Sequence, residues 1–362
     1  MNALLNISKN QITQDVFMSY LELYKNIGKN DYYNDLYSQD LKQFLNHEKE
    51  LEAYFFYNIY FSDRKISDTR MRLLLTRDSM PKTKDEILFC NIRDVFSQIF
   101  DSLGSFETNA NEIIDLLNVL GKDVYPSSDL DFYINKTNKM TKIEITKLKQ
   151  EKKIFLEKTL EKYNELVKKN EYEISFLIVN LYVDFINSEF FNELSEPLFM
   201  IVLYVLLLQN GLDCYKYVSF FEQIVTNKKE IDNALLQAKF NYNDGFPMVV
   251  PLNRIFIKMF IKAYHKLNDN TRNYLYDQGQ RKGDYIENTI NKLGDIFTKD
   301  EIRNSHPLIS DSTIQRTLTK MRDQGLIRPL GTGRSSKWIK LYQTEKKLDF
   351  TSSNINVKLV DK

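Results

Sequence analysis

Residues 195–211 read SEPLFMIVLYVLLLQNG, the most apolar run of the chain. Ser195 can cap the start of a helix, Pro197 is tolerated in a first helical turn, and Gly211 is typical of a helix end. The central part, 198–208, is far shorter than the roughly 20 residues that a membrane span needs. The run therefore predicts a helix that is buried on all sides.

Helical periodicity continues on both sides of this run. Apolar residues recur at helical spacing in these segments: 12–27, 41–61, 69–76, 85–103, 109–120, 141–169, 173–186, 220–226, 229–240 and 251–267. Only 11 glycines and 7 prolines occur in 362 residues, so few turns are signalled and the fold is predicted to be mainly α. The stretch 124–134 differs, because a turn at 125–129 precedes the alternating Leu130, Phe132 and Ile134. That pattern predicts a small β-hairpin.

Composition bounds the class of protein. The apolar fraction is 43%, the charged fraction is 27%, and the net charge is +1, all ordinary for a soluble globular protein. Two cysteines, Cys90 and Cys214, lie in apolar stretches. We interpret them as buried free thiols in a protein of the reducing cytoplasm, not as a disulfide framework. The first residues lack the basic start and long apolar core of a signal peptide. We expect a cytoplasmic protein with no membrane contact.

The pattern changes after the polar segment 269–283. Thr298 and Glu301 have capping-box spacing, Ser310 can cap a further helix that stops at Gly325, and strand-like runs follow at 326–330 and 338–342. A helix over 286–297 precedes them. This order is typical of a winged helix-turn-helix, predicted here for 284–342. The remaining boundaries are predicted as N-terminal helices over 1–51, a helical domain over 52–268, and a tail over 343–362.

The helix after Ser310 has two distinct faces. Ile314, Leu318 and Met321 recur at helical spacing and form the predicted buried stripe. The candidate DNA-binding residues lie opposite it or in the following turn: Ser312, Thr313, Gln315, Arg316, Thr319, Lys320, Arg334 and Lys337. From 281 to 340, twelve Lys and Arg stand against seven Asp and Glu, which leaves the rest of the chain net negative. This asymmetry indicates that the region forms a nucleic-acid face. Helix-turn-helix proteins usually bind two half-sites as dimers, so we expect a homodimer. The alternative is a winged helix that contacts only protein.

The segments of the central region follow one another in a characteristic order. Glu52-Ala53 opens a helix, and the helices 86–103 and 109–120 precede the hairpin near Tyr125. The run 182–185 then leads into a loop before the helix 198–211. The segment 231–238, IDNALLQA, lies downstream. This layout resembles the Fic (filamentation induced by cAMP) family, whose active members transfer a nucleotide monophosphate, usually AMP from ATP, to a target hydroxyl. The resemblance implies that the hairpin is the flap that holds the target peptide.

The Fic signature, HPFxDGNGR, is degenerate in this sequence. Residues 189–197 read EFFNELSEP. The aligned positions of interest are Glu189 for the catalytic histidine, Phe191 for the phenylalanine, Glu193 for the metal-binding aspartate, Leu194 and Glu196 for the glycines, and Pro197 for the phosphate-binding arginine. A second arginine of some members aligns with Met200. Because the base, the backbone amide nest and the guanidinium are all missing, we expect an inactive protein that binds no cofactor.

The inhibitory helix of the family is altered in parallel. Its serines align with Phe56 and Tyr57, its glutamate with Tyr60, and its glycine with Phe61. We expect Tyr57, Tyr60 or Phe61 to pack toward the helix that begins at Ser195 and to fill the former nucleotide cavity.

No other motif indicates chemistry. The three histidines are far apart and no CxxC spacing occurs, so no metal site is predicted. The favoured interpretation is a catalytically inactive Fic-like protein that binds DNA or acts as a scaffold. Two alternatives remain open. One is a divergent nucleotide transferase that uses Glu189 and Glu193 with a metal, and the other is a protein-only adaptor.

Overall fold

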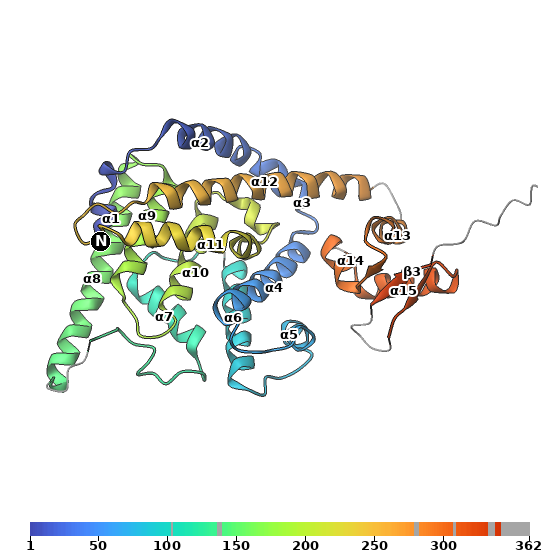
Figure 1. Cartoon of the computed structure of the whole chain (residues 1–362), viewed down its shortest axis with the longest axis horizontal. Helices are drawn as coiled ribbons and strands as arrows, with labels where there is room; N and C mark the ends of the chain where they lie inside the picture. The colour runs from blue at the N-terminus through green and yellow to red at the C-terminus, as the bar shows by residue number, and fades with distance from the viewer. Residues whose placement is uncertain (103, 136–139, 279–281, 307–308, 332–336, 342–362) are drawn as a thin grey trace, which may run out of the picture. The chain divides into compact units, whose positions relative to one another are not determined.

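The computed structural model describes residues 1–102, 104–135, 140–278, 282–306, 309–331 and 337–341. The chain forms two compact units, Met1–Tyr276 and Asp277–Lys362 (Figure 1). The first unit contains the following helices: α1 (Asn2–Leu5), η1 (Ile7–Lys9), α2 (Gln14–Ile27), α3 (Asn30–Tyr37), α4 (Leu41–Tyr60), α5 (Asp68–Leu75), α6 (Lys84–Asp101), α7 (Ala110–Gly121), α8 (Lys142–Lys169), α9 (Ile174–Ser188), α10 (Ser195–Gln209), η2 (Asp213–Lys216), α11 (Phe220–Lys239) and α12 (Val250–Gln278). The predicted boundary between residues 51 and 52 falls inside α4, and α12 continues through most of the polar segment that begins at residue 269.

Helices α9 and α10 form the centre of the first unit. Every residue of α10 from Leu198 to Leu208 is buried, as predicted, and so is every residue of α9 from Ser175 to Phe185. The two helices pack on each other, while α7 lies against α10 and α8 against α9. Each fully buried aliphatic or aromatic side chain contributes about 1.5–3 kcal/mol, so this pair supplies much of the stability.

Aromatic side chains join the central pair to its neighbours. Phe56 of α4 contacts Phe96 of α6 and Phe221 of α11, with ring centroids 5.6 and 5.0 Å apart. Tyr204 of α10 stacks on Phe220 at 5.4 Å. The high aromatic content of the sequence is therefore used largely in the core.

Long-range hydrogen bonds hold the N-terminal helices on α12. The Tyr20 hydroxyl of α2 donates to Asn253 Oδ1 at 3.1 Å, and the hydroxyls of Tyr37 and Thr271 are 2.9 Å apart. Figure 1 shows α2 lying along α12. One face of α2 is thereby buried against the body of the unit.

Two predicted elements of the first unit differ from the structure. No β-hairpin forms among the described residues of 124–135; instead Phe132 makes a single antiparallel bridge with Phe191. The segments 220–226 and 229–240 belong to one continuous helix, α11. Between them the Asn227 side-chain amide donates to the Gln223 carbonyl at 2.8 Å, and Lys228 pairs with Asp232 one turn later.

The second unit combines three helices with a small sheet. Its elements are α13 (Lys282–Lys292), β1 (Ile296–Phe297), α14 (Lys299–Ser305), α15 (Asp311–Asp323), β2 (Ile327–Pro329) and β3 (Trp338–Lys340). The antiparallel sheet has the order β1-β3-β2, with Phe297 opposite Trp338 and Arg328 opposite Ile339. The predicted helix over 286–297 is wrong at its end, because Ile296 and Phe297 leave the helix to pair with β3.

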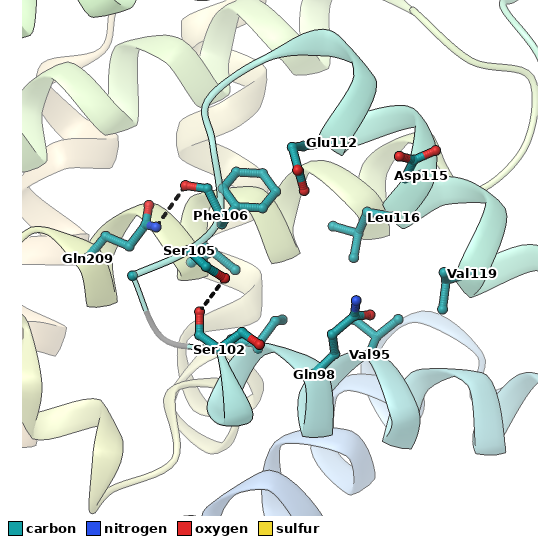
Figure 2. A pocket seen from close by; sticks show the side chains of 13 residues that line it. Val95, Gln98, Ser102, Ser105, Phe106, Glu112, Asp115, Leu116, Val119 and Gln209 are labelled. Carbon is teal, nitrogen blue, oxygen red and sulfur yellow. Dashed lines mark hydrogen bonds between the residues drawn. The ribbon is translucent and has the colours of Figure 1, made fainter.

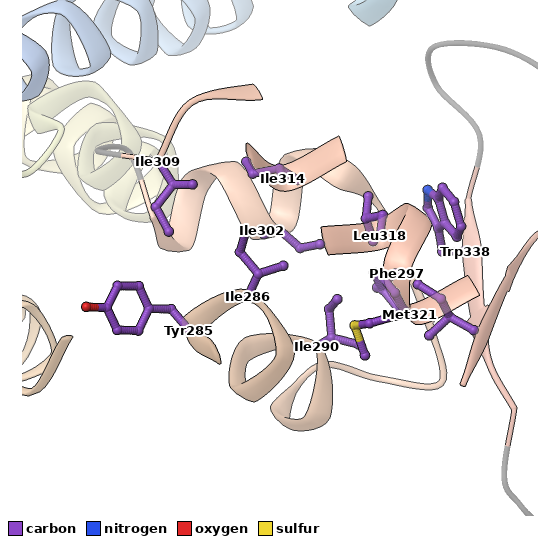
Figure 3. Packing of buried hydrophobic residues seen from close by; sticks show 11 residues of the cluster. Tyr285, Ile286, Ile290, Phe297, Ile302, Ile309, Ile314, Leu318, Met321 and Trp338 are labelled. Carbon is purple, nitrogen blue, oxygen red and sulfur yellow. The ribbon is translucent and has the colours of Figure 1, made fainter. Parts of the chain in front are cut away.

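The core of the second unit confirms the predicted stripe. Figure 3 shows Ile314, Leu318 and Met321 of α15 directed into a cluster that includes Ile286 and Trp338. The capping box of Thr298 and Glu301 and the cap of Ser310 on α15 are present as predicted. Local caps and one apolar stripe therefore position α15 with its other face outward.

Two further expectations can be compared with the structure. Cys90 and Cys214 are free and buried. Within the described part of the chain, no helix has the length and apolar character required to cross a membrane.

Candidate functional site

The loop between α9 and α10 occupies the position that the sequence aligned with the Fic signature. Glu189 and Leu194, at its two ends, both adopt left-handed backbone conformations, with φ of 45° and 58°. The left-handed region disfavours residues with a Cβ atom by about 1–2 kcal/mol. Leu194, which was aligned with a signature glycine, therefore adopts a backbone conformation that glycine takes readily.

The predicted cap of α10 is wrong. Ser195 is the first residue of the helix, and the cap position belongs to Leu194, which offers no side-chain hydrogen bond. The Leu194 carbonyl instead accepts the first helical bond from Leu198, at 2.9 Å. The buried Leu194 side chain, 6% exposed, anchors this turn to the core.

Aromatic packing holds the loop against the protein. Phe190 and Phe191 are buried, and both contact Phe199 of α10 with ring centroids 5.8 and 5.9 Å apart. Phe185 stacks on the same Phe199 at 4.2 Å, and Phe132 stacks on Phe191 at 5.0 Å. Phe191, the one residue identical to the signature, is thus a core residue of this loop.

The segment around Phe132 lies along the loop and makes hydrogen bonds with its backbone. Tyr133 N–H donates to the Phe190 carbonyl at 2.8 Å, and Asn192 N–H donates to the Asp131 carbonyl at 3.1 Å. Glu193 N–H donates to the Asp129 carbonyl at 3.3 Å. The amides of Asn192 and Glu193 are therefore satisfied within the chain.

The acidic side chains of the loop face solvent. Glu189, Glu193 and Glu196 are exposed, and Lys228 Nζ lies 3.8 Å from the Glu196 carboxylate. Lys152 Nζ donates to the Glu189 carbonyl at 2.6 Å, and its partial burial lowers the pKa of the amine while the Glu189 charge opposes that change. Among the described residues, no three His, Cys, Asp or Glu side chains gather where a metal ion could be held.

The end of α4 approaches the start of α10 through Tyr60. Burial raises the pKa of Tyr60 well above its ordinary value, and the nearby Tyr182 and Glu196 raise it further. Within the described chain, the hydroxyls of Tyr60 and Tyr182 are buried without a hydrogen-bond partner. Tyr57 instead packs on Phe89 of α6, at 5.2 Å. Tyr60, one of the aromatic residues expected near the start of α10, therefore has an electrostatic interaction with Glu196 there.

Comparison with known proteins identifies the fold. No family model and no curated protein matches this sequence. A Fic family protein from Desulfovibrio desulfuricans G20 superposes with a TM-score of 0.50, at 10% identity, over 93% of this chain and 98% of that chain. This chain has a Fic-like fold. A Fic domain containing signaling protein from Bacteroides thetaiotaomicron VPI-5482 superposes with a TM-score of 0.50, at 16% identity, over 68% of this chain and 98% of that chain.

At these identities the likeness concerns the fold, so the chemistry of the Fic-like loop depends on its own residues. Pro197 is half-buried in the first turn of α10 and has no N–H to donate. Met200, aligned with a second arginine, is 2% exposed and belongs to the core. Neither position presents a cation to the loop.

A cavity of about 270 Å³ lies at the other end of α10 (Figure 2). It is lined by residues of α6, α7 and α10, with the Gln209 amide donating to the Phe106 carbonyl at 2.9 Å. Glu112 and Asp115 line it from α7, and none of its described lining residues is Lys or Arg. Sequence reasoning missed this cavity because α10 contributes one wall from more than 70 residues beyond α6 and α7.

The candidate DNA-binding residues of α15 divide by exposure. Ser312, Gln315, Arg316 and Lys320 are exposed, as is Lys337 before β3. Thr313 and Thr319 are half-buried, and Arg334 lies outside the described residues.

Two kinds of contact already engage this face. The hydroxyls of Ser312 and Thr313 each lie 2.9 Å from Ser310 Oγ at the start of α15. Lys320 Nζ donates to Glu287 Oε1 at 2.8 Å, and this carboxylate raises the pKa of the amine. The sequence reasoning omitted Arg328, which is exposed on β2 directly after the buried Ile327. Its position in the strand-like run 326–330, within the positively charged region 281–340, is the signal that could have found it.

Proposed function

We propose that this chain is a DNA-binding regulator whose Fic-like body is a catalytically inactive scaffold and whose second unit is a winged helix-turn-helix. The observation that carries the proposal is the element order of the second unit, α13-β1-α14-α15-β2-β3, with a three-stranded antiparallel sheet. In a winged helix, the last helix enters the major groove and the strands that follow carry the wing. The proposal assigns this recognition role to helix α15.

The exposed chemistry of α15 supports the proposal. Gln315 can read a base edge, while Arg316 and Lys320 suit phosphate oxygens or guanine. A phosphate that binds Lys320 has to displace the Glu287 carboxylate from the Lys320 amine. The Lys320 side chain is 58% exposed in this ion pair. An exposed ion pair of this kind is worth about 0–1 kcal/mol, so DNA can displace it at low cost.

The loop between α9 and α10 supports the absence of nucleotide transfer. Glu189 stands where the resemblance places a general base, and an ordinary carboxylate is a much weaker base than histidine at neutral pH. The amides of Asn192 and Glu193 donate to the chain's own carbonyls, so they are not available to phosphate oxygens. Pro197 replaces the arginine that would grip the phosphate.

Binding of duplex DNA by the purified chain tests the DNA-binding proposal. Fluorescence anisotropy with labelled duplexes, repeated across salt concentrations, gives affinity and salt slope for the parent and for Arg316→Ala with Lys320→Ala. We expect the double variant to lose binding, and each phosphate contact removed to lower the salt slope by about 1. Its melting temperature should stay close to that of the parent, because both side chains are exposed.

A matched control separates a local effect from loss of general positive charge. Arg272→Ala with Lys147→Ala removes one arginine and one lysine from the first unit, where the side chains are 75% and 77% exposed. This control should bind DNA like the parent. If the parent binds no DNA at low salt, or the α15 variant binds as tightly as the parent, the protein-only adaptor becomes the better interpretation.

A second experiment tests catalytic inactivity. The chain is incubated with labelled ATP, magnesium or manganese, and cell lysate. We expect neither a labelled target nor automodification. Label that appears with the parent and disappears with Glu193→Ala would support the divergent transferase and overturn the inactive scaffold.

A further inference from the structure

Helix α2 is apolar on two faces, of which the protein covers only one. Val16, Tyr20 and Leu23 are buried against the body of the first unit. On the other side, four large side chains remain about half exposed: Phe17 (56%), Met18 (56%), Leu21 (51%) and Tyr24 (45%). A surface helix of a monomer typically places polar residues on this side.

These four side chains form one continuous stripe. Phe17, Leu21 and Tyr24 stand at i, i+4 and i+7, so they follow one another along a single helix face, and Met18 flanks Leu21. Contiguous exposed apolar surface of this kind marks an interaction site more often than scattered single residues do. We call Phe17, Met18, Leu21 and Tyr24 the α2 stripe.

The size of the α2 stripe fits an interface between proteins. Large side chains of this type present about 150–250 Å² each, so four that are about half exposed offer about 400 Å² of apolar surface. About 57% of a typical interface is non-polar. If the stripe supplies that non-polar part, the whole interface covers about 700 Å² on each partner. A standard stable interface buries about 800 Å² on each partner. The stripe with its polar rim is therefore large enough for a specific complex.

The charges beside the α2 stripe favour a second copy of the same helix. Asp15 lies in the first turn of α2, while Lys25 lies in its last turn and Lys29 follows directly. When two copies pair antiparallel about Leu21, Asp15 of each copy approaches Lys25 and Lys29 of the other. A parallel pair would instead align like charges and like helix dipoles, which is unfavourable.

Other charged groups near the stripe are compatible with this pairing. Arg254 holds Asp15 at 3.0 Å, on the side of α12, and leaves the Asp15 side chain 61% exposed. Glu22, which would lie near the two-fold axis, is directed to His265, with Glu22 Oε1 3.4 Å from His265 Nε2. The hydroxyl of Tyr24 donates to Glu173 at 2.9 Å and fixes this ring at the edge of the stripe.

We propose that the chain forms a two-fold symmetric dimer in which the α2 stripes of two copies pack antiparallel, centred on Leu21. The pairing is isologous, because each copy presents the same face to the other. This inference does not depend on DNA binding, since its evidence lies in the first unit and its readout is the mass of the particle in solution. Such a dimer would also supply the two copies of α15 that a two-fold symmetric DNA site requires.

Sedimentation across micromolar concentrations tests the dimer with charged variants. Leu21→Glu places two carboxylates opposite each other at the two-fold axis, and we expect self-association to weaken by at least about 100-fold. Leu236→Glu is the matched control, because Leu236 of α11 is equally apolar, 67% exposed and outside the stripe. The control should keep the mass of the dimer, and both variants should keep the circular dichroism of the parent.

Cysteine cross-linking tests the antiparallel arrangement. Leu21→Cys should form an intermolecular disulfide on oxidation, because the two copies of residue 21 face each other. Phe17→Cys should not, since the two copies of residue 17 would be displaced by about 12 Å along the helix axis at 1.5 Å per residue. A disulfide requires Cα atoms within about 7 Å. The native Cys90 and Cys214 are 7% and 0% exposed and should not compete.

Results of two kinds would overturn the inference. The first is a parent that sediments as a monomer throughout the micromolar range, or a Leu21→Glu variant that sediments with the same dimer mass as the parent. The second is cross-linking by Phe17→Cys without cross-linking by Leu21→Cys, which excludes antiparallel pairing centred on Leu21. A dimer that depends on Leu21 but binds no DNA would support the inference while contradicting the proposed function.

Discussion

Two buried carboxyl groups on α4 make the stability of the first unit depend on pH. Glu48 is 4% exposed and Glu52 is fully buried, one helical turn apart. Glu52 accepts hydrogen bonds from Ser219 Oγ at 2.7 Å and from the backbone amides of Phe220 and Phe221 at 2.7 and 2.9 Å. It therefore caps the start of α11 from a different helix. In contrast, Glu48 Oε2 has no hydrogen-bond partner among the described residues.

Burial changes the pKa of both groups in the same direction. It raises the pKa of Glu52 from 4.5 to about 7, against the opposing effect of the three hydrogen bonds. It raises the pKa of Glu48 well above its ordinary value, and the neighbouring Glu52 raises it further while Lys266 opposes this. Because the folded protein favours the protonated forms, these groups leave stability intact below pH 4.5 and reduce it as pH rises. For Glu52 the loss amounts to about 3 kcal/mol by pH 7, at about 1.4 kcal/mol per pKa unit.

Substitution by glutamine should have opposite effects at the two positions. Glu48→Gln removes a buried ionisable group that makes no hydrogen bond, so we expect a variant more stable than the parent at pH 8 and similar to it near pH 4.5. Glu52→Gln turns one carboxylate oxygen into an NH2 group, so either the Phe220 amide or the Phe221 amide with the Ser219 hydroxyl loses its acceptor. Leaving these donors unsatisfied should cost about 1–3 kcal/mol at pH 5.

Urea unfolding at pH 5 and pH 8, followed by circular dichroism at 222 nm, measures these differences. Trp338 is the single tryptophan of the chain and lies in the second unit, so its fluorescence is an internal control that neither α4 variant should change. Two results would contradict this. The first is an equal free energy of unfolding of the first unit at pH 8 and pH 5, and the second is a Glu48→Gln variant destabilised as much as Glu52→Gln.

Two further predictions concern single side chains. Leu194→Gly relieves about 1–2 kcal/mol of left-handed strain but removes a buried leucine, a loss of about 2–5 kcal/mol. We therefore expect a net decrease in the free energy of unfolding and no gain of AMP transfer; an increase in the urea midpoint would contradict this balance. Arg70 holds the pKa of Glu86 at about 2 by a hydrogen-bonded ion pair. The stability that Glu86 contributes should be present above pH 4.5 and lost toward pH 2, and Glu86→Gln should remove this acid sensitivity; acid unfolding curves that coincide for parent and variant would exclude it.

Sequence patterns predicted the features that depend on neighbouring residues. The apolar run 198–208 became the buried centre of α10, and the caps at Thr298 and Ser310 formed where the sequence indicated. Ile314, Leu318 and Met321 form the predicted buried stripe of α15. Such features follow from the 3.6-residue period and from hydrogen bonds that span three residues, both of which are fixed within one or two turns of chain.

The sequence failed where the partner of a group is distant. The alternation at Leu130, Phe132 and Ile134 suggested a hairpin, yet Phe132 pairs with Phe191 across 59 positions of sequence. Ser195 had the composition of a cap, but packing of the Leu194 side chain placed leucine in the left-handed cap position. The partner of a strand or of a helix cap is determined by tertiary contacts. Local propensity is too weak to determine that partner.

The sequence by itself therefore determined most of the helical segments, the buried centre of α10 and the two faces of α15. Only the tertiary structure decided that Glu52 of α4 caps α11, that residues 129–133 occupy the amides of the loop before α10, and that the α2 stripe is left uncovered. The physical reason is that periodicity shows which side chains are apolar, whereas burial depends on which surfaces the packed helices bring together. Hydrophobic burial is non-directional, so a pattern along the chain does not specify its partner.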